Sequence, residues 1–284
     1  MRAFHSNWTK PFFEKHTGNY YVEDFELLTT ILSALKWQEL NGDIQMITDV
    51  VGAAYYKKMG LEKIWNLGID DSLERNMKEA LNPGTFWAAG KIYALEKQNT
   101  PCVMLDTDFI IWQSLEGELS KHDLTVIHRE SLQEEVYPPK DQLKVNPTYK
   151  FSKNWDWSIE ACNTAFTCFN DKTFKDYYVR ESIRFMQSVK SEDWLIYMVF
   201  AEQRLLAMCA AEKEIDIFSF STTEALFHSS QKLFTHIWGY KRYIRGSSAI
   251  RAHFCKRCIT RIKQDYPLVF PLLYKIESLM PYLP

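Results

Sequence analysis

The stretch Pro101–Asp108, with the sequence PCVMLDTD, decides the fold class of this chain, and the apolar segment Phe109–Trp112 follows it. An apolar run of this length, bounded by proline and two carboxylates, is typical of a buried strand. Open α/β sheets bind their ligands at the carboxyl ends of the strands, where this strand places Asp106 and Asp108. Alternation along an extended chain would turn both side chains to the same side. Two hard oxygen ligands there predict a site for Mg²⁺ or Mn²⁺ and a diphosphate.

The composition is that of a globular protein with a large core. The 284 residues are 46% hydrophobic and 25% charged, with a net charge of −2, which argues against general nucleic-acid binding. The first eight residues contain no apolar segment of signal-peptide length, and no stretch reaches the apolar length needed to cross a bilayer. We therefore expect a cytoplasmic protein whose six cysteines are reduced. Cys255 and Cys258 form a lone C-x-x-C pair, which favours incidental helix thiols over a zinc or redox site.

The first half of the chain alternates between strand-like and helix-like segments. Strands are predicted at 2–5, 44–48, 63–67 and 101–105, and helices at 24–40, 52–59, 72–81 and 85–97, the last capped by Thr85. This alternation predicts a mainly parallel sheet with helices on both faces, an α/β fold. The glycine-rich phosphate loops of dinucleotide folds and P-loop proteins are absent from the sequence. Phosphate must therefore be held another way, and a carboxylate-bound metal is the obvious candidate.

The second half of the chain is less regular. Strands are predicted at 124–128, 161–169 and 215–220, and helices at 171–189, where Asp171 is the cap, at 195–212 and, with a basic sequence, at 247–264. Because no repeat or linker interrupts the sequence, we expect a single domain over 1–284. Residues 1–115 would form a nucleotide-binding half, and residues 116–284 an acceptor-binding half that ends in the basic helix.

The order of these elements resembles the GT-A fold glycosyltransferases, whose Asp-x-Asp motif follows the strand that ends the nucleotide-binding half. The helix-then-strand unit Phe86–Leu95 and Pro101–Trp112 is similar to theirs, and Lys91 matches a basic residue of the glycogenin-like and capsular-polysaccharide-type branches. Thr235–Lys241 (THIWGYK) resembles the late His-x-x-Gly-x-x-Lys motif of the glycogenin-like branch. Here the lysine comes one residue early and the usual Pro-Trp after it is missing.

The resemblance implies a role for each motif residue around a nucleotide-sugar donor. Asp108 would bind the metal, Asp106 the metal or the donor ribose, and His236 would be a third metal ligand. Lys241 and Lys91 would neutralise the departing diphosphate. Asp49, at the end of an earlier strand, has two interpretations that stay open: it contacts the base or ribose, or it caps the following helix.

The resemblance also implies residues on the acceptor side and near the reacting centre. The segment 155–165 would line an acceptor pocket, with Trp157 stacking on a sugar and Asp156 and Asn163 bonding hydroxyl groups. Packing of the tryptophans in the core is the alternative. Glu202 would be the base of an inverting reaction or would hold the donor sugar in a retaining one.

The leading hypothesis is therefore a metal-dependent glycosyltransferase that moves a sugar from a UDP-sugar to a glycan or glycolipid, with a tilt toward retention. One alternative is a catalytically inactive GT-A-like domain that binds a glycan or a protein partner. Another is a phosphatase with Asp106 as nucleophile, which the late position of the motif disfavours. The basic helix is either a solvated face or a peripheral contact with the inner face of a membrane; its cations are Arg245, Arg251, Lys256, Arg257, Arg261 and Lys263.

Overall fold

The computed structural model of the protein describes residues 1–77, 81–228 and 231–284. Within these residues, a seven-stranded sheet forms the centre, in the spatial order β10 (Ile217–Ser219), β6 (Leu124–Val126), β9 (Phe166–Phe169), β4 (Cys102–Leu105), β1 (Arg2–Asn7), β2 (Ile44–Thr48) and β3 (Ile69–Asp70). Neighbouring strands are parallel except at β9, which runs antiparallel to both β4 and β6. A mixed, mainly parallel sheet of this kind, flanked by helices, confirms the predicted α/β class.

Two short antiparallel pairs stand outside this sheet. β7 (Arg129–Glu130) pairs with β8 (Ala161–Cys162), and β5 (Phe109–Ile111) pairs with β11 (Phe234–His236). Because β5 follows β4 after one turn, the second pair brings a late part of the chain beside the carboxyl end of β4.

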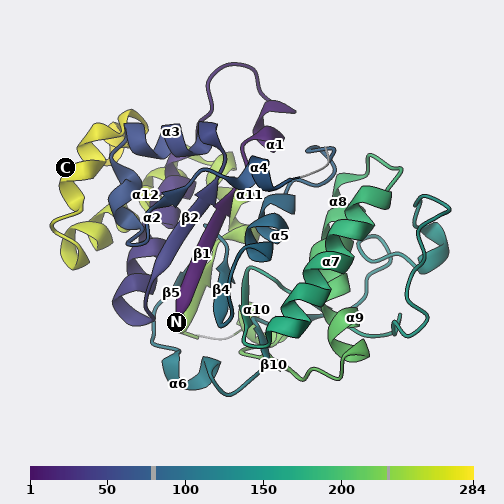
Figure 1. The fold of residues 1–284 in the computed structure, drawn as a ribbon. Coiled ribbons are helices and arrows are strands. Elements are labelled where there is room, and N and C mark those ends of the chain that lie inside the picture. Colours follow the sequence, from purple (N-terminus) through teal and green to yellow (C-terminus); the bar gives the residue numbers. More distant parts are fainter. Residues whose placement is uncertain (78–80, 229–230) are drawn as a thin grey trace.

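Helices cover both faces of the sheet (Figure 1). One face packs against α2 and α12, and the other against α5, α7 and α9. The α-helices are α1 (Lys10–Phe13), α2 (Asp24–Leu40), α3 (Val50–Lys58), α4 (Leu73–Asn76), α5 (Ala89–Glu96), α6 (Glu116–Leu119), α7 (Lys172–Ser188), α8 (Trp194–Val199), α9 (Leu205–Glu212), α10 (Thr223–His228), α11 (Lys241–Gly246) and α12 (Ser248–Asp265). Short 3-10 helices cover Leu61–Ile64, Lys140–Gln142, Trp238–Tyr240, Phe270–Lys275 and Glu277–Tyr282.

The apolar run before Asp106 is explained by burial on both faces. Successive side chains of β4 alternate between the two hydrophobic clusters: Cys102 and Met104 pack toward α5 and α7, and Val103 and Leu105 toward α2. All four are buried. A strand covered by helices on both sides is apolar at every position, as the sequence shows.

Several predicted elements have the predicted bounds, and others do not. The helix at 24–40 and the strand at 44–48 are confirmed. The strand predicted at 63–67 is wrong: Gly60, at φ 71, leads into a 3-10 helix, and after Gly68 the edge strand β3 holds only two residues. The helix predicted from residue 72 ends at Asn76, and residues 78–80 of that prediction lie outside the described residues.

The predicted cap at Thr85 is also wrong. Helix α5 begins only at Ala89, and its N-cap is Ala88. The hydroxyl group of Thr85 donates instead to the carbonyl of Ser191, at 3.4 Å. Asp171, in contrast, caps α7 as predicted, because its carboxylate accepts from the N–H of Phe174.

The helix predicted at 195–212 contains an irregularity that the sequence did not suggest. α8 and α9 are joined by a π-helical turn, Phe200–Arg204, so the whole helical stretch is Trp194–Glu212. By length and composition this stretch is apolar enough to span a membrane, contrary to our expectation that no stretch is. However, 72% of the most apolar part of this stretch is buried inside the protein, where it packs against α7.

Candidate metal centre

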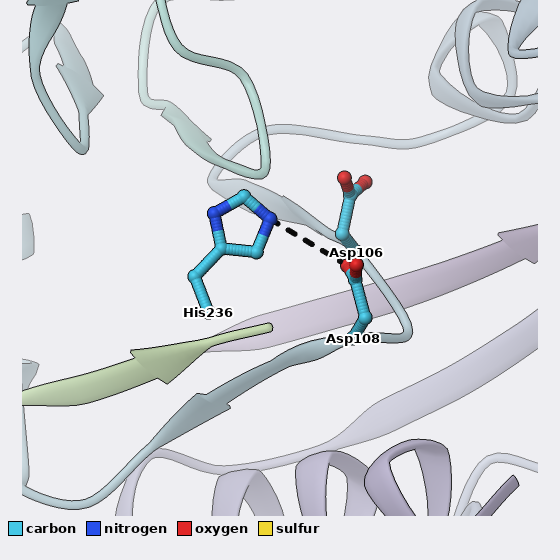
Figure 2. A group of neighbouring side chains, drawn as sticks. All are labelled: Asp106, Asp108 and His236. Atoms are coloured by element: carbon cyan, nitrogen blue, oxygen red, sulfur yellow. Dashed lines mark ion pairs between the residues drawn. The ribbon is translucent and has the colours of Figure 1, made fainter. Parts of the chain in front are cut away.

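Asp106, Asp108 and His236 converge at the carboxyl end of β4. The aspartates lie in the turn between β4 and β5, and His236 ends β11. One ligand atom from each of the three side chains lies within 4.8 Å of the other two. The imidazole faces the carboxylate of Asp108, with 3.7 Å between Nε2 and Oδ1 (Figure 2). The two aspartates are brought together by a turn, in which the N–H of Phe109 donates to the carbonyl of Asp106 at 3.1 Å. The alternation of side chains along an extended strand, which we expected to bring them together, is not the cause.

The protonation states of Asp108 and His236 suit a divalent cation. Burial lowers the pKa of His236 to about 4, although Asp108 opposes the shift, so the ring is neutral at pH 7 and has a free lone pair. Burial alone would raise the pKa of Asp108, but Lys241 and His236 hold it below its usual value. Two carboxylates with one neutral imidazole form a donor set that fits Mn²⁺, and Mg²⁺ with more water in its shell.

Two lysines link these aspartates to glutamates on helices. Nζ of Lys241 lies 2.9 Å from Oδ2 of Asp108 and 2.9 Å from Oε1 of Glu26, on α2. Nζ of Lys91 lies 2.6 Å from Oδ1 of Asp106. Burial disfavours both ammonium groups, yet the carboxylates beside them outweigh it and raise the pKa of both lysines. The centre therefore holds two fixed cations suited to a polyanionic ligand.

The second carboxylate beside Lys91 belongs to Glu202, whose Oε1 lies 2.5 Å from Nζ of Lys91. Glu202 is 2% exposed and also accepts from the hydroxyl of Thr164, at 2.8 Å. It sits in the π-helical turn, a feature common at functional sites. Helix α7 satisfies the carbonyls of that turn: Tyr178 donates to the Glu202 carbonyl and Ser182 to the Ala201 carbonyl, at 2.7 and 2.8 Å.

Asp106 differs from Asp108 in its electrostatic environment. Burial raises the pKa of Asp106 to about 7, even though Lys91 counteracts the shift. Asp108 and Glu202 add to the rise, because like charges nearby disfavour ionisation. The cluster therefore concentrates more negative charge than its two lysines fully compensate, which favours the entry of a further cation.

A cavity of about 240 Å³ adjoins this cluster. It is lined by Thr107, which lies between the two aspartates, and by Lys241, which pairs with Asp108. It opens at the carboxyl end of β1. Nδ2 of Asn7 is buried there without a hydrogen-bond partner among the described residues, while Oδ1 accepts from the hydroxyl of Tyr20 at 3.0 Å. The other lining residues are Trp8, Phe12, Tyr20, Tyr21, Val22, Glu26, Thr30 and Tyr56. Apart from Thr107 and Lys241, the residues that line the cavity belong to no short motif, so the sequence alone does not single them out.

Asp49 caps helix α3, which is one of its two interpretations from the sequence. Its carboxylate accepts from the N–H of Gly52 at 2.9 Å. It also accepts from the N–H and the hydroxyl of Thr9, at 2.6 and 3.1 Å. Asp49 is 2% exposed, and its bonds to Thr9 hold the loop that follows β1.

Of the three residues assigned to the acceptor side, Asn163 lies in a buried polar network. Its amide donates to Oε1 of Glu130 at 2.8 Å, and the hydroxyl of Tyr137 donates to Oε2 of the same carboxylate, also at 2.8 Å. Tyr137 in turn lies 2.5 Å from Oε1 of Gln203, the neighbour of Glu202. No local pattern marks Glu130 or Tyr137 as a partner of Asn163, because only tertiary structure brings the three residues together.

The other two acceptor-side residues make local contacts. The ring of Trp157 stacks on Phe200, with centroids 5.7 Å apart, and meets Phe151 edge-on. Asp156 accepts from the N–H and the hydroxyl of Ser158, at 2.8 and 2.6 Å. Trp157 is thus part of a packed aromatic group, the alternative that the sequence left open.

The basic C-terminal helix packs on α2, in the half of the chain assigned to the nucleotide. Arg251 pairs with Asp24 at 2.7 Å, and Arg245 pairs with Glu23 at 2.5 Å and with Glu26 at 3.1 Å. Part of the basic sequence therefore serves to hold α11 and α12 to α2. Cys255 and Cys258, also on α12, are buried free thiols, and burial raises the pKa of Cys258 to about 12.

Comparison with known proteins gives a family and distant structural likenesses. Residues 1–276 match DUF6734, described as a family of unknown function. No curated protein matches the sequence. Solved structures with a similar arrangement include mouse xyloside xylosyltransferase 1 in its apo form, at 8% identity and a TM-score of 0.40, covering 78% of this chain and 84% of that one.

Two further solved structures resemble this chain. One is a nucleoside-diphosphate-sugar pyrophosphorylase from Vibrio cholerae RC9, at 13% identity and a TM-score of 0.40, covering 79% of this chain and 93% of that one. The other is an active-site mutant of LgtC, at 13% identity and a TM-score of 0.35, covering 72% and 70%. These TM-scores indicate only a coarse likeness, so any statement about the chemistry of this protein must rest on its own residues.

Proposed function

Since this chain belongs to DUF6734, a family of unknown function, we propose an activity from its own residues: it is a metal-dependent glycosyltransferase. It moves a sugar from a nucleotide-sugar, a UDP-sugar in this proposal, to a glycan or glycolipid acceptor. The observation that carries the proposal is the convergence of Asp106, Asp108 and His236 next to a cavity lined by Thr107, which lies between the two aspartates, and by Lys241, which pairs with Asp108.

The donor's diphosphate would lie where the metal centre meets the two lysines. Asp106, Asp108 and His236 would hold a Mn²⁺ or Mg²⁺ ion, which when bound supplies a Lewis acid for the leaving diphosphate. Lys241 and Lys91 would stabilise the negative charge that the leaving group gains as the glycosidic bond breaks. Because both ammonium groups are already fixed by carboxylates, little reorganisation is needed when that charge develops.

The nucleoside of the donor would occupy the neighbouring cavity. Its aromatic lining offers stacking surfaces for a base, and Phe12 meets Tyr20 and Tyr21 edge-on with centroids 5.1 and 5.0 Å away. The unpaired Nδ2 of Asn7 needs an acceptor, and a base carbonyl would supply one. Glu202, on the other side of Lys91, would hold the donor sugar in a retaining reaction or act as base in an inverting one.

The acceptor would approach over the segment that follows His236. Trp238 is 65% exposed, and its ring stacks on that of His236 with centroids 6.2 Å apart. Tyr240 and Tyr243 are exposed on the same segment. Aromatic faces of this kind stack on sugar rings, which supports a glycan as the acceptor.

Calorimetric titration of UDP, with and without Mn²⁺, tests the proposal. The wild type should bind UDP in a metal-dependent way, and Asp108→Ala should abolish this binding because it removes a metal ligand. Glu118→Ala, which removes a carboxylate that is paired with Lys121 and His122 near the surface, is the control and should bind like the wild type. UDP binding that is indifferent to both the metal and Asp108 would contradict the proposed site.

A further inference from the structure

We propose that His5 and Ser33 are positioning residues for the metal centre. Together with Trp65 they form a buried chain of hydrogen bonds, the His5 relay, which ends on the carbonyl of Phe109, the residue after Asp108. The relay touches none of the three candidate ligands. This inference rests on the proposed metal site and extends it to residues that no sequence motif marks.

The relay is continuous and shielded from water. The indole Nε1 of Trp65 lies 3.1 Å from Nδ1 of His5, and Nε2 of His5 lies 3.0 Å from Oγ of Ser33. Oγ of Ser33 then lies 2.5 Å from the carbonyl oxygen of Phe109. His5 and Ser33 are 0% exposed, and Trp65 and Phe109 are 1% exposed. Water cannot replace any of these bonds, so breaking one leaves a buried polar group unsatisfied.

Donor and acceptor chemistry fixes the direction of every bond. An indole N–H can only donate, so Nδ1 of His5 must be the unprotonated acceptor. Nε2 of His5 therefore carries the proton and donates to Ser33. The hydroxyl hydrogen of Ser33 is then free to donate to Phe109. The imidazole is thus held in one tautomer and one orientation.

The conformation of Ser33 differs from that of its neighbours on α2. The hydroxyls of Thr29 and Thr30 bond back to the carbonyls of Phe25 and Glu26, four residues earlier, as such side chains commonly do within helices. Ser33 instead donates across to β5. Serine has a lower helix propensity than alanine. Its presence at position 33, where it bonds to β5 and not to its own helix, indicates that Ser33 serves to hold the carbonyl of Phe109.

The carbonyl at the end of the relay lies next to two of the three candidate metal ligands, Asp108 and His236. Phe109 follows Asp108 directly, and in the β5–β11 pair it lies opposite His236. Its ring also meets the imidazole of His236 edge-on, with centroids 5.4 Å apart. The N–H of Ile237 donates to the carbonyl of Asp108 at 3.3 Å. Anchoring the Phe109 carbonyl to α2 therefore fixes β5, which directly follows Asp108, and its partner β11, which ends in His236.

The test compares two variants that each remove one buried hydroxyl from α2. Ser33→Ala breaks the relay, and Thr29→Val removes a hydroxyl bonded only within the helix, four residues earlier. Two quantities are measured: the affinity for Mn²⁺ alone by calorimetry, and backbone hydrogen exchange of a peptide covering residues 105–112 in the metal-free protein. Loss of such an outer partner weakens metal binding roughly 10- to 100-fold.

We expect Ser33→Ala to weaken Mn²⁺ binding by roughly tenfold or more and to speed exchange in 105–112. Thr29→Val should change neither quantity. Equal behaviour of the two variants in both measurements would overturn the proposal. If the wild type itself does not bind Mn²⁺, the proposed metal site fails, and the exchange comparison still decides whether the relay fixes the turn.

Three further variants cover the case in which Ser33→Ala does not fold. Trp65→Phe keeps an aromatic ring and removes the N–H that sets the tautomer of His5, together with part of the buried ring volume. His5→Gln retains one acceptor and one donor and should restore part of the affinity that an apolar His5→Leu loses. A purely space-filling role would instead make the leucine variant bind Mn²⁺ as well as the glutamine variant.

Discussion

The carboxylates of Asp106 and Glu202 share one ammonium group, that of Lys91, at 2.6 and 2.5 Å. Asp108 shares the ammonium of Lys241 with Glu26 in the same manner. The protein thus contains its own counter-ions for the carboxylates that would bind a metal. A cation entering the centre would have to compete with these lysines, and a diphosphate arriving with it would give their charges a new partner.

Removing Lys91 should destabilise the fold. Lys91→Met leaves the buried Glu202 without its cation, and breaking a buried pair in this way costs about 3 kcal/mol. The double variant Lys91→Met with Glu202→Gln removes both charges and should recover much of that loss. Urea unfolding of the two variants and of Glu202→Gln closes a double-mutant cycle. A cycle with no coupling energy would show that the two side chains do not interact in solution.

Asp49 should matter more to stability than Asp171, although both are helix N-caps. Asp171→Ala loses one capping bond, worth about 1 kcal/mol. Asp49→Ala loses a capping bond and also leaves the buried N–H of Thr9 without its acceptor, which raises the expected cost to about 2 kcal/mol or more. Thermal unfolding of both variants provides the comparison. Equal losses would mean that water replaces the bond to Thr9.

Substitutions at Trp157 and Trp238 should have different effects, the first on stability and the second on acceptor binding. Trp157→Ala removes a ring stacked on Phe200 and should cost about 2 kcal/mol, because only part of the ring is buried. Trp238→Ala should change stability by less than about 0.5 kcal/mol. Its effect should be on transfer: with UDP binding unchanged, the ratio of sugar transfer to donor hydrolysis should fall. The acceptor surface proposed here would be wrong if Trp238→Ala left that ratio unchanged.

Stability should fall in acid partly because of His5. Burial lowers the pKa of His5 in the folded protein to about 3, although Asp108 opposes the shift, whereas an unfolded histidine titrates near pH 6.5. Between these values the unfolded chain binds a proton that the folded chain does not. The contribution is therefore complete above about pH 6.5 and is lost as the pH falls, by up to about 1.4 kcal/mol per pH unit.

The His5→Gln variant isolates this contribution. Between about pH 4 and 6, its free energy of unfolding should depend less steeply on pH than that of the wild type. The difference in slope should reach up to about 1.4 kcal/mol per pH unit, which corresponds to one proton. Urea unfolding at several pH values measures both slopes. Identical slopes would show that His5 is protonated in the folded protein.

The regular parts of the fold were predictable from local sequence. The helix Asp24–Leu40 has apolar residues at helical spacing and a stop signal at Asn41-Gly42, and the strand Ile44–Thr48 is a short, mostly apolar run that follows. The segment 161–169 has the same apolar character but forms two strands, because Oδ1 of Asn163 accepts from the N–H of Ala165 and turns the chain. A short polar bond of this kind has no periodicity from which it could be read.

The candidate site was predictable only where a motif carries it. Asp106, Asp108 and His236 stand in short patterns that suggest a metal, and the structure brings them together. Glu26 and Asn7 stand in segments that read simply as a helix and a strand end, so nothing local marks them. Their position depends on which strand ends meet at one sheet edge, and this is a property of the fold.

The π-helical turn Phe200–Arg204 has a consequence for comparing related sequences. Such a turn holds one residue more than the α-helical turn it replaces. The wide turn accommodates the extra residue while the helices on either side keep their register, so deleting one residue would restore an α-helical turn and move Glu202 relative to Lys91 and Thr164. In an alignment, a one-residue gap between positions 199 and 205 would therefore divide the relatives into two groups. One group could present a carboxylate to Lys91, beside Asp106, and the other would keep the glutamate in its sequence and present it to a different neighbour.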